Sequence, residues 1–389
     1  MRLSNEEIHK IMEENDCKYT LSWSKLNTFV EDPYSFYLKY VHNPRIPEEK
    51  RNSYAFLGDV VHSGLEAFYA GTKDIDTIID DFETKIMEQR LSDMNFVKDE
   101  DKNSKIEQNY YSCIKHFLKN YKRKSKNSKL EVFVGYKFND YFMQGYIDHM
   151  YPLIDENNHQ YVVIEDFKTS TLYSGAKIEQ NSGQLKLYAY MIHKNYNIPI
   201  DSIKIGWNFL KYVGVDIKQK NGKVKESKIL RNELPDKLFQ KMKTWAKHFK
   251  YSDDDIVKFY DIMKNNNEEF KDVNIFDGIP TEIAEKFNIH DCFVEIPFDE
   301  QVLTNFIQYV SDTIEDMSNK INLYKVTKDD KIFWSDIDAS NSFYYLNLCG
   351  YTSKHHLPLR EYLNKISSFE GTPNKQIDDD VMEFLFKNT

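Results

Sequence analysis

Residues 142–168, FMQGYIDHMYPLIDENNHQYVVIEDFK, carry the strongest structural signal in this chain. Apolar and polar side chains alternate from Phe142 to Leu153 and again from Tyr161 to Phe167, a pattern typical of two β-strands. Between them lies the polar run Asp155–His159, whose residue types favour a turn. The stretch therefore predicts an antiparallel hairpin.

The position of the turn determines which residues meet across the hairpin. If the chain reverses at Asn157, Asp148 falls opposite Asp166, because each lies nine positions from the turn. Directly opposed side chains have Cβ atoms about 5 Å apart, and two like charges there destabilise a sheet. A divalent cation held by the carboxylates would offset the repulsion, and a shared proton is the metal-free alternative.

Lys168 adds a cation to the same face of the hairpin. It lies two residues after Asp166, so both side chains project to one side, whereas Glu165 and Phe167 point to the other. Two carboxylates and an ammonium group suit metal-assisted hydrolysis of a phosphodiester. An isolated Asp-x-Lys is most simply a surface ion pair, and the register with Asp148 is what favours the catalytic interpretation.

Helical periodicity dominates before the hairpin, and strands and helices mix after it. The Asn221-Gly222 pair predicts the tip of a second hairpin. This order of elements favours a mixed α/β (α+β) fold, with a central mixed sheet flanked by helices, over an alternating βαβ series. We expect helices at about 54–69, 75–91, 106–122, 183–196, 234–288 and 300–323, and strands from 130 and at 203–212 and 292–296.

The composition of the 389 residues is that of a globular protein, with 41% hydrophobic, 29% charged and 15% aromatic residues, which excludes a wholly disordered chain. No segment approaches the ~18 apolar residues of a spanning helix, and no apolar signal core follows Met1. We therefore expect a soluble, cytoplasmic protein with no membrane partner. The widely spaced Cys17, Cys113, Cys292 and Cys349 favour reduced thiols over disulfides or a zinc site.

The formal net charge of −10 argues against wholesale coating of nucleic acid, although a local basic groove remains compatible with it. Two basic runs are candidates for such a groove. The simpler interpretation of each is a solvated helix end or a charged hairpin. The runs are Lys115, Lys119, Lys122, Arg123, Lys124, Lys126 and Lys129, and Lys218, Lys220, Lys223, Lys225 and Lys228.

Five short motifs lie in order between positions 22 and 188. Together they resemble the RecB-type branch of the PD-(D/E)XK nucleases, which includes AddB and the CRISPR-adaptation nucleases; beyond about Tyr212 the resemblance is thin. It implies a restriction-endonuclease-like core. The motifs are Ser22-x-Ser24-x-x-x-x-Phe29-x-x-Asp32-Pro33-x-x-Phe36, Gly58-Asp59-Val60-Val61-His62 with Leu65-Glu66, Gly145-Tyr146-Ile147-Asp148, Ile164-Glu165-Asp166-Phe167-Lys168-Thr169, and Gln184-x-x-x-Tyr188.

The resemblance assigns a role to each residue that matches a motif. It implies that His62, Asp148 and Asp166 ligate Mg²⁺ or Mn²⁺, with help from the backbone carbonyl of Phe167. Lys168 would be the catalytic lysine. Water activated at the metal would then hydrolyse the phosphodiester.

Three of these residues have plainer interpretations. Gln184 and Tyr188, one helical turn apart, would contact the active site or the DNA backbone, but they also suit an amphipathic helix as a polar residue and a core aromatic. A single helical histidine such as His62 is more often structural than a ligand. Asp59 or Glu66, on the same side of the helix, could orient its imidazole or approach the metal.

Many RecB-type relatives carry an iron–sulfur cluster held by one upstream cysteine and three near the C-terminus. Here the upstream place is Asp32-Pro33, and the stretch Phe343–Tyr351 retains only Cys349. A cubane cluster normally takes four thiolates. We therefore expect no cluster, and aromatic packing could close the same joint between the chain ends.

We expect four regions and a deoxyribonuclease, most simply an exonuclease that acts on DNA ends in recombination, repair or phage DNA metabolism. A structure-specific endonuclease and a non-catalytic DNA-binding scaffold are the alternatives. No Walker motif is present, so any helicase or recombinase would be a separate partner. The regions are a helical part with the histidine motif (1–128), the nuclease core (129–213), a hairpin and helical insertion (214–290), and a C-terminal part that completes the core (291–389).

Overall fold

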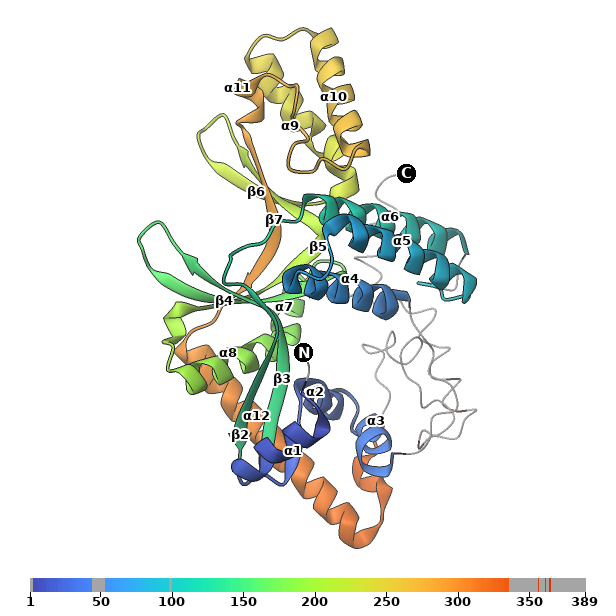
Figure 1. The fold of residues 1–389 in the computed structure, drawn as a ribbon, viewed down its shortest axis with the longest axis vertical. Coiled ribbons are helices and arrows are strands. Elements are labelled where there is room, and N and C mark those ends of the chain that lie inside the picture. The colour runs from blue at the N-terminus through green and yellow to red at the C-terminus, as the bar shows by residue number, and fades with distance from the viewer. Residues whose placement is uncertain are drawn as a thin grey trace.

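The computed structural model describes residues 3–43, 53–97 and 100–335, together with positions 356, 361 and 364. Within these residues the chain forms a seven-stranded mixed sheet with helices on both faces (Figure 1). The mixed α/β fold class that the sequence predicts is thereby confirmed.

The sheet has the strand order β1-β3-β4-β5-β6, with β2 paired to β3 and β7 paired to β5. The β1–β3 and β4–β5 pairs are parallel and the other pairs are antiparallel. The strands are β1 (Tyr19–Leu21), β2 (Lys129–Phe138), β3 (Tyr141–Ile154), β4 (Gln160–Lys168), β5 (Ile203–Lys218), β6 (Val224–Leu230) and β7 (Phe287–Ile296).

The β3–β4 hairpin has the predicted register. Its pairs run from Ile154–Gln160 beside the turn to His149–Glu165 at the far end of the ladder. Asp148 and Asp166 are the next residues on their strands.

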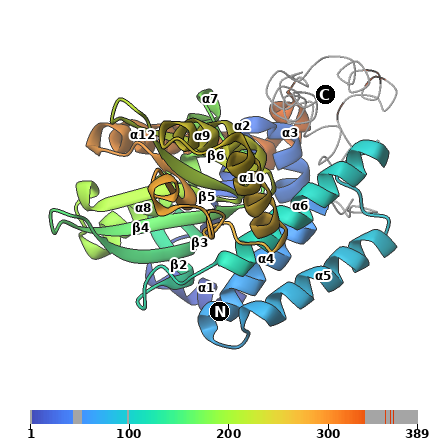
Figure 2. The ribbon, with the colours of Figure 1, turned by 90° about the horizontal axis from the view of Figure 1, so that it is seen from above.

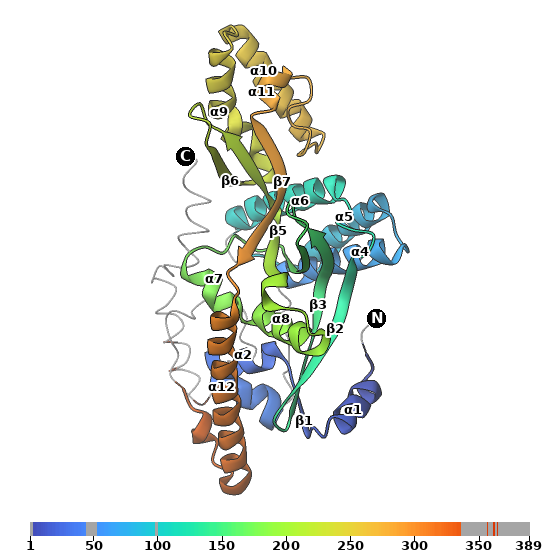
Figure 3. The same cartoon turned by 90° about the vertical axis from the view of Figure 1, so that its left-hand side faces the viewer.

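Helices cover the sheet in two layers, which separate clearly when the molecule is seen from above (Figure 2). Helices α4, α5 and α6 pack together on one side, whereas α8 and α12 lie on the other. Helices α9 to α11 cover the extension formed by β5, β6 and β7 at one end of the molecule (Figures 1 and 3). In the described ranges, no helix is both long enough and apolar enough to cross a membrane. The helices are α1 (Asn5–Glu14), α2 (Trp23–Glu31), α3 (Pro33–Phe36), α4 (Ser53–Ala70), α5 (Ile75–Leu91), α6 (Glu100–Asn120), α7 (Ala176–Asn181), α8 (Gly183–Tyr196), α9 (Leu234–His248), α10 (Asp253–Glu268), α11 (Thr281–Ala284) and α12 (Glu300–Thr327), with a π-helical turn at Tyr37–His42.

Three strands differ from the sequence prediction. The short strand β1 was not expected, because three residues do not establish a period. Strand β5 runs on to Lys218, since Val213, Val215 and Ile217 are buried beneath α9. Strand β7 begins at Phe287 and pairs with β5 over a longer stretch than the apolar run alone indicates. The four-region division stays a prediction.

Arg231, a buried residue only 2% exposed, ties the helical segment after β6 to the sheet and to α6. Its Nε donates to the carbonyl of Leu210 (2.8 Å), and one terminal nitrogen donates to Asp272 (2.7 Å). The other terminal nitrogen lies 3.6 Å from Asp291. Asp272 also contacts His116 of α6, so one guanidinium neutralises carboxylates from two segments.

Replacing this cation should cost much more stability than replacing an exposed one. Arg231→Met leaves Asp272 buried without its cation and should lower the free energy of unfolding by ~3–5 kcal/mol in urea titrations. Lys237→Met is the matched control, because Lys237 is 47% exposed and its partner Glu233 is 3.6 Å away; its loss should be about 0–1 kcal/mol. Equal losses in the two variants would contradict this account.

Candidate active site

The carboxyl groups of Asp148 and Asp166 lie at the end of the β3–β4 ladder. The regular pairs stop at His149–Glu165, and the backbone N–H of Phe167 then donates to Asp148 Oδ2 over 3.2 Å. This bond connects the two strands beyond the last pair. The Asp148 and Asp166 side chains are 16% and 7% exposed, so the cluster is largely withdrawn from water.

Helix α4 brings His62 to this point. The helix packs into the core through Leu57, Val61 and Leu65, which are fully buried and leave His62 directed at the strand end. The imidazole Nδ1 lies 3.3 Å from Asp148 Oδ2, and Nε2 lies 3.0 Å from the carbonyl oxygen of Phe167. The structure thus joins residues that are far apart in the sequence.

Two acidic neighbours of His62 do not share this contact. Among the described residues, neither Asp59 nor Glu66 forms a hydrogen bond or ion pair with the imidazole. The acidic residue that contacts the imidazole is Asp148 of β3. The suggestion that Asp59 or Glu66 orients His62 therefore receives no support from the geometry.

Lys168 forms an ion pair with Asp166, with Nζ 2.6 Å from Oδ2. Its side chain is 28% exposed, more than those of the two aspartates. Lys168 is therefore the most accessible member of this group of three side chains.

Gln184 and Tyr188 reach the same strand from α8. Gln184 Nε2 donates to the Tyr188 hydroxyl over 2.9 Å. The Tyr188 ring lies so close to Gly145 that a Cβ there would be 2.4 Å from the ring, so any other residue at this position would displace the ring. The charges of Asp148 and Asp166 act on this phenol, whose pKa burial raises to about 12. The glycine of the Gly145–Asp148 motif thus allows α8 to approach the carboxylates.

The model of the PD-(D/E)XK nuclease superfamily matches residues 20–270, which include all of these site residues. The chain belongs to this superfamily. As a member it is a nuclease by family, and its central mixed sheet flanked by helices is consistent with the restriction-endonuclease-like fold.

Comparison with solved structures finds a similar protein from Eubacterium rectale described as a "Putative exonuclease". The two chains share 10% sequence identity at a TM-score of 0.30, over 75% of this chain and 90% of that one. A similarity of this size has no bearing on the activity of the present chain. No curated protein matches it.

The electrostatics of the candidate site follow from its burial. Burial first, and then the charge of Asp166, raises the pKa of Asp148 well above its usual value. Burial also lowers the pKa of His62, which favours the neutral imidazole. Burial opposes the charge on Lys168, but the attraction of Asp166 outweighs it and the lysine pKa is raised. Lys168 therefore compensates the charge of Asp166.

The donor atoms suit a hard divalent cation. Carboxylates of Asp148 and Asp166 and the carbonyl of Phe167 supply oxygen ligands of the kind that Mg²⁺ prefers, and PD-(D/E)XK nucleases generally use such metals. Within the described ranges, however, no group of three or more His, Cys, Asp and Glu side chains forms a ready metal cluster. Both nitrogens of His62 are engaged, so the imidazole could ligate a cation only by giving up one contact. The ligand set stays a prediction.

Glu131 is an acidic neighbour that the motifs do not contain. The β2–β3 register on either side of it places it opposite Asp148, and its φ of 48° is in the left-handed region. Its charge contributes to the raised pKa of Asp148. Counting outward from the turn at Asn139-Asp140, as for the β3–β4 hairpin, would have identified it from the sequence.

Asp32 stands where the resemblance places the upstream cluster cysteine. Its carboxylate caps α3 through the N–H of Tyr34 and accepts a bond from the Ser335 hydroxyl, each over 3.0 Å. The Tyr37 ring lies 5.2 Å from that of Phe333. Hydrogen bonds and aromatic contacts thus join the N-terminal segment to residues that follow α12. The stretch 343–351, including Cys349, lies outside the described residues, and the absence of a cluster stays a prediction.

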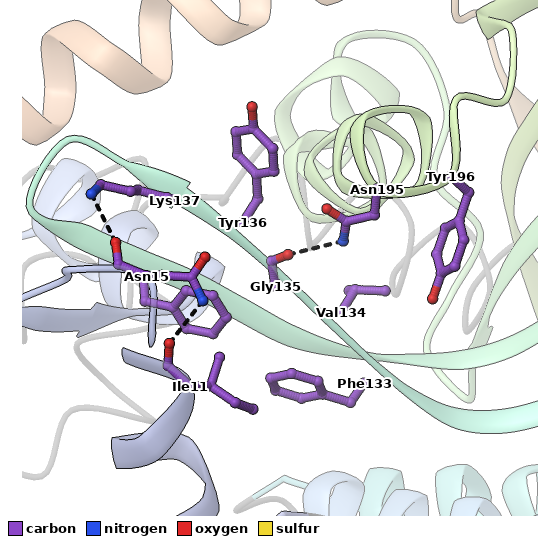
Figure 4. Close-up of a pocket in the computed structure, with 10 residues that line it drawn as sticks. Ile11, Asn15, Phe133, Val134, Gly135, Tyr136, Lys137, Asn195 and Tyr196 are labelled. Atoms are coloured by element: carbon purple, nitrogen blue, oxygen red, sulfur yellow. Dashed lines mark hydrogen bonds between the residues drawn. The ribbon is translucent and has the colours of Figure 1, made fainter. Parts of the chain in front are cut away.

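A cavity of about 520 Å³ lies along β2 between α1 and the end of α8, and none of its lining residues is a candidate site residue (Figure 4). Asn195 donates to the carbonyl of Gly135 over 3.0 Å, and Lys137 donates to that of Asn15 over 2.7 Å. The first bond occupies a backbone carbonyl of the edge strand β2, and the second joins β2 to the end of α1, as expected where an edge strand is shielded. The active-site assignment therefore rests on the strand-end cluster and not on this cavity.

The raised pKa of Asp148 predicts a pH dependence of the metal-free protein. In the folded state this carboxyl holds its proton at a pH where the unfolded chain has lost it, so stability falls as pH rises from about 4 through the raised value. Asp148→Asn removes this loss. In EDTA at neutral pH we expect the variant to melt at a higher temperature than wild type, and near pH 4 the difference should shrink. A lower melting temperature for Asp148→Asn at neutral pH would contradict the assignment.

Proposed function

We propose that this nuclease is a metal-dependent deoxyribonuclease of the RecB type that degrades DNA from its ends, in recombination, repair or phage DNA metabolism. The observation that carries the proposal is the meeting of Asp148, Asp166 and Lys168 at the end of one strand pair, with His62 delivered by a separate helix. The preference for ends and the pathway rest on the motif resemblance alone.

Asp148, Asp166, His62 and the carbonyl of Phe167 would hold Mg²⁺ or Mn²⁺. A bound divalent ion supplies Lewis acidity that polarises the phosphate and lowers the pKa of water. Lys168 is protonated, since its pKa is raised, and it therefore acts as a hydrogen-bond donor and not as a base. Its ammonium group, placed by Asp166, stabilises the negative charge that develops on the phosphate as water attacks phosphorus.

A non-catalytic DNA-binding scaffold would also retain the fold. However, two neighbouring buried carboxylates reduce stability, and a protein that binds phosphates and performs no chemistry gains nothing from them. A structure-specific endonuclease would use the same residues with a different substrate path. Activity assays separate these three.

Incubation of the purified protein with end-labelled linear DNA and closed circular DNA, in Mg²⁺, Mn²⁺ or EDTA, tests the proposal. We expect linear DNA to be degraded with either metal, and circular DNA to survive. Cutting of both would identify an endonuclease, and no cutting with any ion would favour the scaffold.

Variants of Asp166 and Lys168 test the same proposal. Asp166→Ala and Lys168→Ala should each abolish cleavage. The first removes a carboxylate that would hold the metal, and the second removes a charge-stabilising donor, a loss that alone costs about 10²–10³ in rate. The melting temperature of Asp166→Ala should stay close to wild type, because this change removes one of two carboxylates that repel each other. Asp76→Ala, an exposed acidic residue paired with Lys119 on α5 and α6, is the control and should cleave normally. A large loss of stability in Asp166→Ala would instead assign this residue a structural role.

The two basic runs differ in how many of their lysines form ion pairs in the structure. In the first, Lys115 pairs with Glu83, Lys119 with Asp76 and Lys124 with Asp291. The β5–β6 hairpin instead exposes all of its lysines, and none of them forms an ion pair with a described residue. These hairpin lysines are Lys218, Lys220, Lys223, Lys225 and Lys228.

The hairpin extends from the candidate site. Phe209 of β5 pairs with Lys168, and β5 continues from there to Lys218. At ~3.3 Å per residue these nine steps span at most about 30 Å, which is roughly nine base pairs of B-DNA. We propose that the hairpin lysines contact phosphates of DNA that leads to the site.

Loss of hairpin charge should weaken DNA binding in a salt-dependent way. Lys220→Gln/Lys223→Gln/Lys225→Gln should reduce the slope of log K against log salt by about 2–3, because each phosphate contact contributes about 0.9. Binding to duplexes longer than about nine base pairs is measured in EDTA, which prevents cleavage. Lys10→Gln/Lys241→Gln/Lys258→Gln removes the same charge from exposed positions elsewhere. An equal slope for the two triple variants would show that the hairpin lysines do not contact the DNA phosphates.

A further inference from the structure

His149 and Glu165 form a buried pair directly behind the candidate catalytic residues. Each neighbours a catalytic aspartate in the sequence, and together they make the last pair of the β3–β4 ladder. His149 Nδ1 lies 2.6 Å from Glu165 Oε2, and both side chains are 0% exposed.

Stability does not explain this pair. Burying an imidazole and a carboxylate requires desolvation that their mutual attraction barely repays, and apolar residues of similar volume are often as stable or more so. Neither His149 Nε2 nor Glu165 Oε1 has a hydrogen-bond partner among the described residues, which adds to the cost. A pair this expensive is more readily explained by what it holds in place.

Phe167 connects the pair to the site. Its ring stacks on the His149 imidazole, with centroids 5.4 Å apart and planes 21° apart. Tyr69 of α4 and Tyr151 of β3 contact the same imidazole, at 5.1 Å and 4.8 Å. The imidazole is therefore held by the carboxylate of Glu165 and by rings from three elements, α4, β3 and β4.

The backbone of Phe167 makes two of the contacts that define the site. Its N–H donates to Asp148, and its carbonyl oxygen lies 3.0 Å from His62 Nε2. The stacking of the Phe167 ring on His149 therefore helps to fix the orientation of the Phe167 N–H and carbonyl groups. A shift of the ring would move the Phe167 carbonyl and, at the same time, weaken the hydrogen bond from the Phe167 N–H to Asp148.

We propose that His149 and Glu165 are positioning residues: they fix the Phe167 backbone, and through it the carbonyl oxygen and Asp148, in the arrangement that receives the divalent cation. The pair does not touch the metal or the DNA. This inference rests on the proposed function, because it concerns the same site.

The decisive variant replaces both partners with apolar residues. His149→Leu/Glu165→Leu leaves no unpaired buried charge, so we expect a melting temperature equal to or above that of wild type. Mn²⁺ affinity, measured by calorimetry without DNA, should fall by about 10–100-fold, the usual effect of losing a partner that orients metal ligands. Cleavage at limiting Mn²⁺ should fall in parallel and recover partly at high Mn²⁺.

Conservative variants distinguish positioning from simple packing. Glu165→Gln keeps an oxygen that accepts from His149 Nδ1 and should bind Mn²⁺ nearly as well as wild type. Met150→Leu, a volume-conserving change at the adjacent ladder pair, should leave Mn²⁺ affinity and cleavage unchanged.

Wild-type Mn²⁺ affinity in the double-leucine variant would overturn the proposal. If that variant does not fold, Phe167→Leu takes its place, since it removes the stacked ring and leaves His149 and Glu165 intact. It should show the same loss of Mn²⁺ affinity, and an unchanged affinity would equally overturn the proposal. A wild-type protein that neither binds Mn²⁺ nor cleaves DNA would instead refute the proposed function.

Discussion

Repulsion between two carboxylates is the constraint around which the candidate site is built. Strand pairing carries Asp148 and Asp166 to adjacent positions, and burial raises the pKa of Asp148 because its charge is poorly solvated. Lys168 compensates one of the two charges. A divalent cation is the natural partner for the other, and such metals are general in this superfamily.

The site lies where two hydrophobic clusters meet. Ile147 and Ile164 belong to the cluster beneath α8 and α12, whereas Phe167 belongs to the one beneath α4, α5 and α6. On β4, Ile164 and Phe167 are three positions apart and therefore anchor opposite layers. This arrangement lets α4 supply His62 and α8 supply Gln184 and Tyr188 to one point.

Those parts of the fold whose signals are local could be predicted from the sequence. The β3–β4 register follows from a turn at Asn157 and a period of two, and it correctly brought Asp148 to Asp166. That His62 meets Asp148 has no local signal, since α4 and β3 are far apart in the chain, and only the family resemblance pointed to it. Strand β1 was missed because its three residues form a strand only when β3 pairs with them. Glu131 and His149 were overlooked because they lie outside the motifs. Glu165 lies inside one, but it was assigned only to the opposite face of its strand, although strand counting pairs it with His149.

Diffraction from crystals soaked in Mn²⁺, with anomalous scattering recorded at the manganese edge, tests the central claim most directly. The account predicts an anomalous peak enclosed by Asp148, Asp166 and the carbonyl of Phe167. No peak there, with Asp166 still bound to Lys168 and Asp148 to His62, would show that the cluster is neutralised by its own cations and would contradict the metal-dependent chemistry.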